Sequence, residues 1–134
     1  MTRIFLALMG ILYVLLALWC AIAPESTSQS VGFTLQPGSG QSEFLTVYGG
    51  LELGLALVFL WPLLQRAVTQ FSLGVCLMVH GSLVLFRTVG FFLFTGFEST
   101  TFYLAGGEWL IFLISLTLLY RQRDSTARDV EFKN

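Results

Sequence analysis

Four apolar stretches, each about as long as a bilayer is thick, constrain what this chain can fold into. They comprise residues 4–23, 44–64, 68–95 and 101–120. A helix needs about 20 residues to cross the roughly 30 Å hydrocarbon core of a membrane. Inside lipid the backbone must satisfy its own hydrogen bonds, and a helix does so within one segment. The runs therefore predict four transmembrane helices.

The composition is that of an integral membrane protein. Hydrophobic residues make up 55% of the 134 residues and charged residues 11%, whereas a soluble domain carries about 25% charged residues. The formal net charge is −1, and the few basic residues form no extended patch, which argues against a nucleic-acid partner. We expect an all-α fold with one domain, residues 1–120, and a short charged tail, residues 121–134.

The first run has a second interpretation. Arg3, the apolar stretch and Ala21-Ile22-Ala23 together resemble a secretory signal with a small-residue cleavage site. However, Pro24 would directly follow the cut, which is unfavourable for cleavage, and only one basic residue precedes the stretch. We therefore expect this helix to be retained in the protein.

Basic residues predict how the helices are oriented, because cytoplasmic loops carry an excess of Lys and Arg. Outside the runs these residues are Arg3, Arg66, Arg121, Arg123, Arg128 and Lys133. They lie in the N-terminal segment, the second connection and the tail, and the first and third connections have none. We expect an integral four-helix bundle of two antiparallel hairpins in the inner (plasma) membrane, with both termini in the cytoplasm.

The connection over residues 24–43 is long and should lie outside the cell membrane. Val31, Phe33 and Leu35 alternate with polar or small residues, a pattern typical of a short strand. The sequence Pro37-Gly38-Ser39-Gly40 predicts a turn. The segment either folds back over the outer end of the bundle or forms a mobile loop, and the sequence leaves both alternatives open.

Four ionisable side chains interrupt the apolar runs: Glu52, His80, Arg87 and Glu108. At about 1.5 Å per residue, Glu52 and Arg87 lie about 12 Å from the outer helix ends and Glu108 about 10 Å. An isolated charge at mid-helix costs about 2.5 to 3.5 kcal/mol on insertion scales. Arg87 stays protonated and has five donors, so we expect it to pair with both glutamates.

Other polar residues extend this cluster. His80 lies seven residues before Arg87, two turns deeper on the same helix face, and Tyr13 is placed to reach it. Tyr48 lies one turn before Glu52. The predicted ligand-binding residues are Glu52, Arg87, Glu108, His80 and Tyr48.

The same residues also fit a purely structural role. Polar side chains between transmembrane helices hold the helices together, and Gly50 and Gly54 form a GxxxG pair that permits close approach. Ser115 lies two turns deeper than Glu108 and extends the polar column. Cys20 and Cys76 should lie in opposite leaflets and act as small packing residues, so we expect no disulfide between them.

The sequence gives little support for a metal site or an enzyme active site. Two glutamates and a histidine are possible metal ligands, but di-iron bundles use Glu-x-x-His pairs, which are missing here, and Arg87 would repel a cation. No serine or cysteine has an obvious base at the spacing that nucleophilic catalysis requires. We expect no metal, no cofactor and no catalytic residues, although the sequence leaves enzymatic activity open.

Short motifs resemble those of known membrane proteins. "VYGGLELGLALVFL", "LFRTVGF" and a glutamate early in the last run resemble a family of small bacterial four-helix membrane proteins of unknown function, similar in layout to DoxX-like proteins. The resemblance covers roughly residues 5–120 and implies a four-helix bundle in the inner membrane. Some DoxX-like proteins are linked to quinone-dependent redox systems, but no redox motif occurs here, so a quinone partner is an analogy.

Two functions remain. In the first, the protein binds a membrane lipid, a quinone or another amphipathic small molecule near the Glu52–Arg87–Glu108 cluster. Phe86, Phe91, Phe92 and Phe94 would suit its apolar part, and Arg87 would suit an anionic headgroup. In the second, the protein is a structural or accessory subunit, a homo-oligomer or part of a larger membrane complex, and the charges serve only helix packing.

Overall fold

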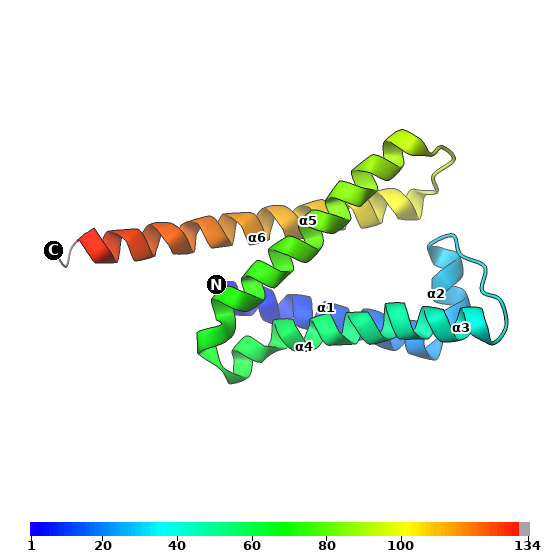
Figure 1. Ribbon diagram of the computed structural model, residues 1–134, viewed down its shortest axis with the longest axis horizontal. Coiled ribbons are helices and arrows are strands. Elements are labelled where there is room, and N and C mark those ends of the chain that lie inside the picture. Colours follow the sequence, from blue (N-terminus) through cyan, green and yellow to red (C-terminus); the bar gives the residue numbers. More distant parts are fainter. Residues whose placement is uncertain (132–134) are drawn as a thin grey trace. The chain divides into compact units, whose positions relative to one another are not determined.

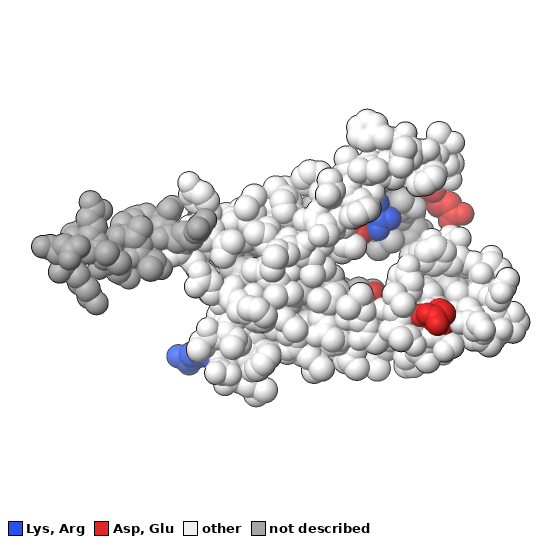
Figure 2. Space-filling model, in the orientation of Figure 1, with Lys and Arg blue, Asp and Glu red and all other residues white. Residues whose placement is uncertain are grey.

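The computed structural model describes the backbone of residues 1–131 and the side chains of residues 1–122. Within this part every regular element is helical and no strand occurs. Four segments are long and apolar enough to cross a membrane: Thr2–Ile22, Ser39–Leu64, Arg66–Leu93 and Ser99–Gln122. Charged side chains are few on the face drawn in Figure 2. The prediction of an all-α chain with four helices able to span a membrane is confirmed.

The chain forms two compact units, the first over Met1–Ser72 and the second beginning at Leu73. In the first unit, α1 (Thr2–Ile22) and α4 (Leu51–Leu64) lie side by side and antiparallel (Figure 1). Small residues permit this contact. A Cβ on Gly10 would lie 2.5 Å from Leu60 Cγ and 3.2 Å from the Ala56 carbonyl oxygen. Close packing of this kind drives helix association in lipid, where burial of apolar surface gives little.

The glycines at this contact differ from those that the sequence suggested. A Cβ on Gly49 would lie 3.9 Å from the Ala17 carbonyl oxygen, whereas one on Gly50 or Gly54 would meet no atom within 4 Å. Successive helical residues point about 100° apart, so only one of two adjacent glycines can face a given neighbour. The Gly50–Gly54 pair therefore does not form the contact with α1. Gly10 packs against α4, and Gly49, which precedes α4, faces α1.

Two side chains satisfy carbonyl groups at the end of α4. Pro62 has no N–H, so the Val58 carbonyl one turn earlier loses its helical donor. The Ser72 hydroxyl donates to that oxygen at 2.8 Å, and Ser72 is fully buried. Arg3 donates through Nε to the Pro62 carbonyl at 3.0 Å and through Nη2 to that of Leu63 at 3.3 Å. Both interactions replace hydrogen bonds that water would provide in a soluble protein.

The connection over residues 24–43 is largely helical, with α2 (Pro24–Ser30) followed by α3 (Ser39–Phe44). After α2, Gly32 has a φ of 83°, its N–H bonds to Gln29, and the N–H of Phe33 bonds to Ser28 at 2.8 Å. This is a Schellman end, in which glycine adopts the left-handed conformation. The strand interpretation of residues 31–35 is wrong, because no neighbouring strand is present and these backbone groups complete a helix end instead.

The same connection contacts the helix that follows it. The Gln41 side chain donates to the Glu25 carboxylate at 2.5 Å, and the Phe33 ring lies 5.9 Å from the Tyr48 ring, measured between centroids. These contacts favour the folded-back alternative. The second span also begins earlier than residue 44, because α3 continues through a π-helical turn, Leu45–Gly50, into α4.

The second unit contains all but the first turn of α5 (Thr69–Leu93), which a short connection joins to α6 (Ser99–Glu131) (Figure 1). Gly96 adopts a φ of 83° within it. Phe91 stacks on Phe102 with centroids 5.5 Å apart, and Phe97 meets the Phe91 ring edge-on at 4.9 Å. These three rings hold the two helix ends together and set the register of one helix against the other.

The last helix is longer than the apolar run. The sequence predicted a helix over 101–120 and a separate tail over 121–134, but α6 continues to Glu131. The end of an apolar run does not end a helix, and no proline or glycine follows Tyr120 to do so. The side chains of residues 123–131, and residues 132–134 altogether, lie outside the described part of the chain.

The hydrogen bond from Ser72 to Val58 predicts a coupled pair of substitutions. Ser72→Ala should lower the free energy of unfolding by about 1 to 3 kcal/mol, because it leaves a buried carbonyl without a donor. Pro62→Ala restores an N–H to that carbonyl, so Ser72→Ala should cost clearly less in the Pro62→Ala background. Thermal melts in detergent of the wild type, the two single variants and the double variant measure this. Equal costs in both backgrounds would contradict it.

Candidate functional site

The principal polar contact of the second unit is an ion pair between α5 and α6. Arg87 donates through Nε to Glu108 Oε2 at 2.9 Å and through Nη2 to Glu108 Oε1 at 2.5 Å. The exposed fractions of the two side chains are 28% and 13%. A bidentate pair of this kind fixes both the position and the angle of the two side chains relative to each other. Each charge thus has its counter-charge within a segment able to cross a membrane, where an unpaired charge is costly.

The register of the hairpin brings these two residues together. Arg87 lies 21 residues before Glu108, and the ring cluster of Phe91, Phe97 and Phe102 lies between them and the connection. Counting residues from the outer helix ends had placed both at a similar depth. The structure joins them directly, so two members of the predicted cluster are in contact.

Glu52 belongs to the first unit, where its contact is with a cysteine. The Cys20 thiol on α1 lies 3.8 Å from Glu52 Oε2 and donates to it. Cys20 is buried, and the sequence had suggested only a packing role for it. A pairing of Glu52 with Arg87 stays a prediction from the sequence.

The backbone immediately before Glu52 is unusual. Residues Leu45–Gly50 form a π-helical turn, a wider turn that occurs mostly as a local feature and often at functional sites. Tyr48 lies in this turn, and its ring stacks on Phe44 with centroids 4.6 Å apart. The turn changes the angle at which Glu52 leaves the helix, so sequence spacing alone could not predict its neighbour.

A second polar group lies deeper in the hairpin. His80 is almost fully buried, and its Nδ1 lies 2.8 Å from the Cys76 carbonyl oxygen. A carbonyl oxygen only accepts, so Nδ1 of His80 is the donor in this bond. The Cys76 thiol lies 3.4 Å from the Ser115 hydroxyl, which itself donates to the Ile111 carbonyl. The thiol is therefore the donor to Ser115.

Cys76 is the member of this group that the sequence analysis missed. Its sulfur lies 3.7 Å from His80 Nδ1, and the spacing of four residues between them places both on one helix face. That spacing is the sequence signal that would have predicted the contact between Cys76 and His80. Both cysteines are free thiols.

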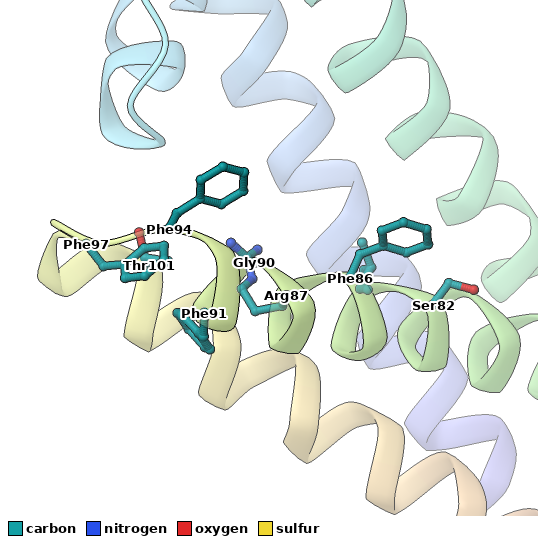
Figure 3. Close-up of a pocket in the computed structure, with 9 residues that line it drawn as sticks. Ser82, Phe86, Arg87, Gly90, Phe91, Phe94, Phe97 and Thr101 are labelled. Atoms are coloured by element: carbon teal, nitrogen blue, oxygen red, sulfur yellow. The ribbon is translucent and has the colours of Figure 1, made fainter.

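An open groove of about 490 Å³ runs along the second unit beside the ion pair. Figure 3 shows Arg87 on α5 between Phe86, on the same helix, and Phe94, just after its end. Gly90 also lines the groove, and a Cβ there would meet no atom within 4 Å. Two side chains in the lining carry an oxygen atom, and they are Ser82 and Thr101. Phe92, which the sequence grouped with these phenylalanines, is not part of the lining.

Metal coordination has no evident place in the described residues. No group of three or more His, Cys, Asp or Glu side chains among them could hold a metal ion. Every buried side-chain nitrogen or oxygen that the structure describes has a hydrogen-bond partner.

Comparisons with protein-family models, with curated proteins and with solved structures gave no match. The resemblance to DoxX-like proteins therefore stays a prediction that is based on the short motifs described above.

Removal of Arg87 tests the ion pair. Arg87→Ala leaves the Glu108 carboxylate without its counter-charge, so the free energy of unfolding should fall by about 3 to 5 kcal/mol. Glu108→Gln in the Arg87→Ala background should restore much of this stability, because the uncompensated charge is gone. His80→Ala should cost less, since a neutral ring leaves no isolated charge.

Thermal melts in detergent measure these effects, with Arg66→Ala as the control that removes an exposed arginine. Addition of Glu52→Gln to the rescued double variant then tests the predicted third member. If Arg87→Ala melts like Arg66→Ala, the pair does not stabilise the protein.

Proposed function

We propose that the chain is a multi-pass protein of the inner (plasma) membrane that binds a lipid-like or other amphipathic small molecule. The binding site is the groove beside the Arg87–Glu108 pair. The observation that carries this proposal is the chemistry of the groove, which combines phenylalanine side chains with one guanidinium group. Neither simple lipid contact nor helix packing requires this combination.

The size and lining of the groove support a small ligand. Ligand sites typically have volumes of about 300 to 1,000 Å³ and are mostly apolar, with a few polar groups that orient the ligand. The groove has a volume of about 490 Å³. A molecule dissolved in the bilayer would reach it from the lipid, with its apolar part on Phe86 and Phe94 and its polar part at Arg87.

The membrane arrangement is part of the same proposal. The four spans form one bundle of two antiparallel hairpins, with both termini in the cytoplasm. The distribution of Lys and Arg supports this orientation. With this orientation, the ion pair lies in the outer half of the membrane. The protein is then a DoxX-like membrane protein in layout, with no catalytic role of its own.

A structural or accessory subunit is the second candidate. It is supported by the internal satisfaction of the polar groups, such as Cys20 with Glu52 and Cys76 with Ser115. On this account the charges only hold helices together, and the protein works as a homo-oligomer or inside a larger membrane complex. Crosslinking in native membranes distinguishes the two, because a protein that is monomeric throughout contradicts the subunit role.

Occlusion of the groove tests the binding function. Gly90→Leu should fill space that Gly90 leaves open, and we expect roughly tenfold less lipid retained after purification. Gly74→Leu is the matched control, since it lies on the same helix, also meets no atom within 4 Å at Cβ, and does not line the groove. Native mass spectrometry of the two variants gives the bound fraction. Equal retention in both would rule out the groove as the site.

Reporter fusions test the orientation. A fluorescent protein that matures only in the cytoplasm should fluoresce when it is fused to either terminus of the chain. The same reporter inserted after Gly38, in the outer connection, should stay dark. Fluorescence from the insertion, or a dark fusion at either end, would contradict the proposed topology.

A further inference from the structure

We infer that the ligand of the groove carries an uncharged, hydrogen-bond-accepting head, such as an ester or ketone carbonyl, rather than an anion. The inference rests on the binding function proposed above. It differs from the simpler expectation that a buried arginine selects an anionic headgroup.

The ion pair itself supports an uncharged head. Arg87 gives Nε and Nη2 to the two carboxylate oxygens of Glu108, so the charges of the two residues cancel. No other residue lining the groove is basic. An anionic head would therefore bring a second negative charge to one guanidinium, in apolar surroundings that stabilise a net charge poorly. If Glu52 also pairs with Arg87, as the sequence predicts, it adds more negative charge and disfavours an anion further.

Polar atoms at the groove favour an acceptor on the ligand. A guanidinium group only donates hydrogen bonds, and its pair with Glu108 uses Nε and Nη2. An oxygen that accepts from a guanidinium while carrying no charge satisfies this site, and a carbonyl oxygen is such a group.

The apolar lining sets the rest of the ligand. Phe86 on α5 and Phe94 just after its end flank Arg87 (Figure 3). Phe91 and Phe97 also line the groove. A ligand with its carbonyl at Arg87 can thus extend an apolar chain or ring over phenylalanine side chains. The inferred class is a neutral, carbonyl-bearing lipid or a similar apolar carbonyl compound.

Three photoreactive probes with the same alkyl chain test this class. One ends in a methyl ester, one in a sulfonate, and one in a plain methyl group. Each is added to the full-length protein in bilayers, and labelled residues are mapped by mass spectrometry. We expect roughly tenfold more labelling of the groove by the ester than by the sulfonate, and clearly less by the hydrocarbon than by the ester. Gly90→Leu should abolish the ester labelling of the groove.

The outcomes separate this inference from the proposed function. Groove labelling by the sulfonate that equals or exceeds the ester labelling overturns the neutral head and leaves the binding function standing. Equal labelling by the ester and the hydrocarbon shows that no head is recognised and also overturns the inference. No groove labelling by any probe, or labelling that Gly90→Leu leaves unchanged, counts against the binding function itself.

A charge variant tests the stated cause. Glu108→Gln removes the carboxylate that neutralises Arg87, so the preference for ester over sulfonate should shrink or reverse. The double variant Arg87→Gln with Glu108→Gln is again uncharged at this position and should continue to reject the sulfonate. It also shows whether loss of fold, rather than loss of charge, explains the single variant. An unchanged preference in Glu108→Gln would show that the ion pair does not set it.

Discussion

The Arg87–Glu108 ion pair is the interaction on which this account depends. A charged side chain inside a membrane must find its counter-charge within the protein, since the solvent offers none. The fork between the two residues neutralises both charges and links α5 to α6 near their connection. Arg87 also lines the adjacent groove, and the ligand class that we infer follows from its pairing with Glu108.

The same physical constraint explains the other polar contacts of the chain. Pro62 leaves a carbonyl without a helical donor, and Ser72 supplies one. Glu52 receives the thiol proton of Cys20, and the Cys76 thiol meets Ser115. Each is a local solution that pairs a polar group within its own unit. Such pairing alone does not indicate a ligand, and the groove beside Arg87 is what distinguishes the ion pair from the other contacts.

Counting residues predicted the spans and the level of their charged residues. Membrane thickness sets the length of a spanning helix, and the helical rise sets how far a residue lies from the helix end. Counting located the four spans and placed Arg87 and Glu108 at one level. It could not predict which helix face each residue occupies. Gly10 faces α4 and Gly49 faces α1, whereas Gly50 and Gly54 meet neither. The π-helical turn before Glu52 has no recognised sequence signal. The role of Cys76 was missed although its spacing from His80 was visible.

The most direct test of the account is the ionisation state of Glu108. Infrared difference spectra of protein with isotope-labelled glutamate carboxyl groups, wild type minus Glu108→Gln, isolate the band of this one carboxyl group. We expect the band of an ionised carboxylate at neutral pH. The same measurement in the Arg87→Ala background should show the protonated acid instead. A protonated Glu108 in the wild-type protein would contradict the ion pair, and with it the neutral site on which the inferred ligand class depends.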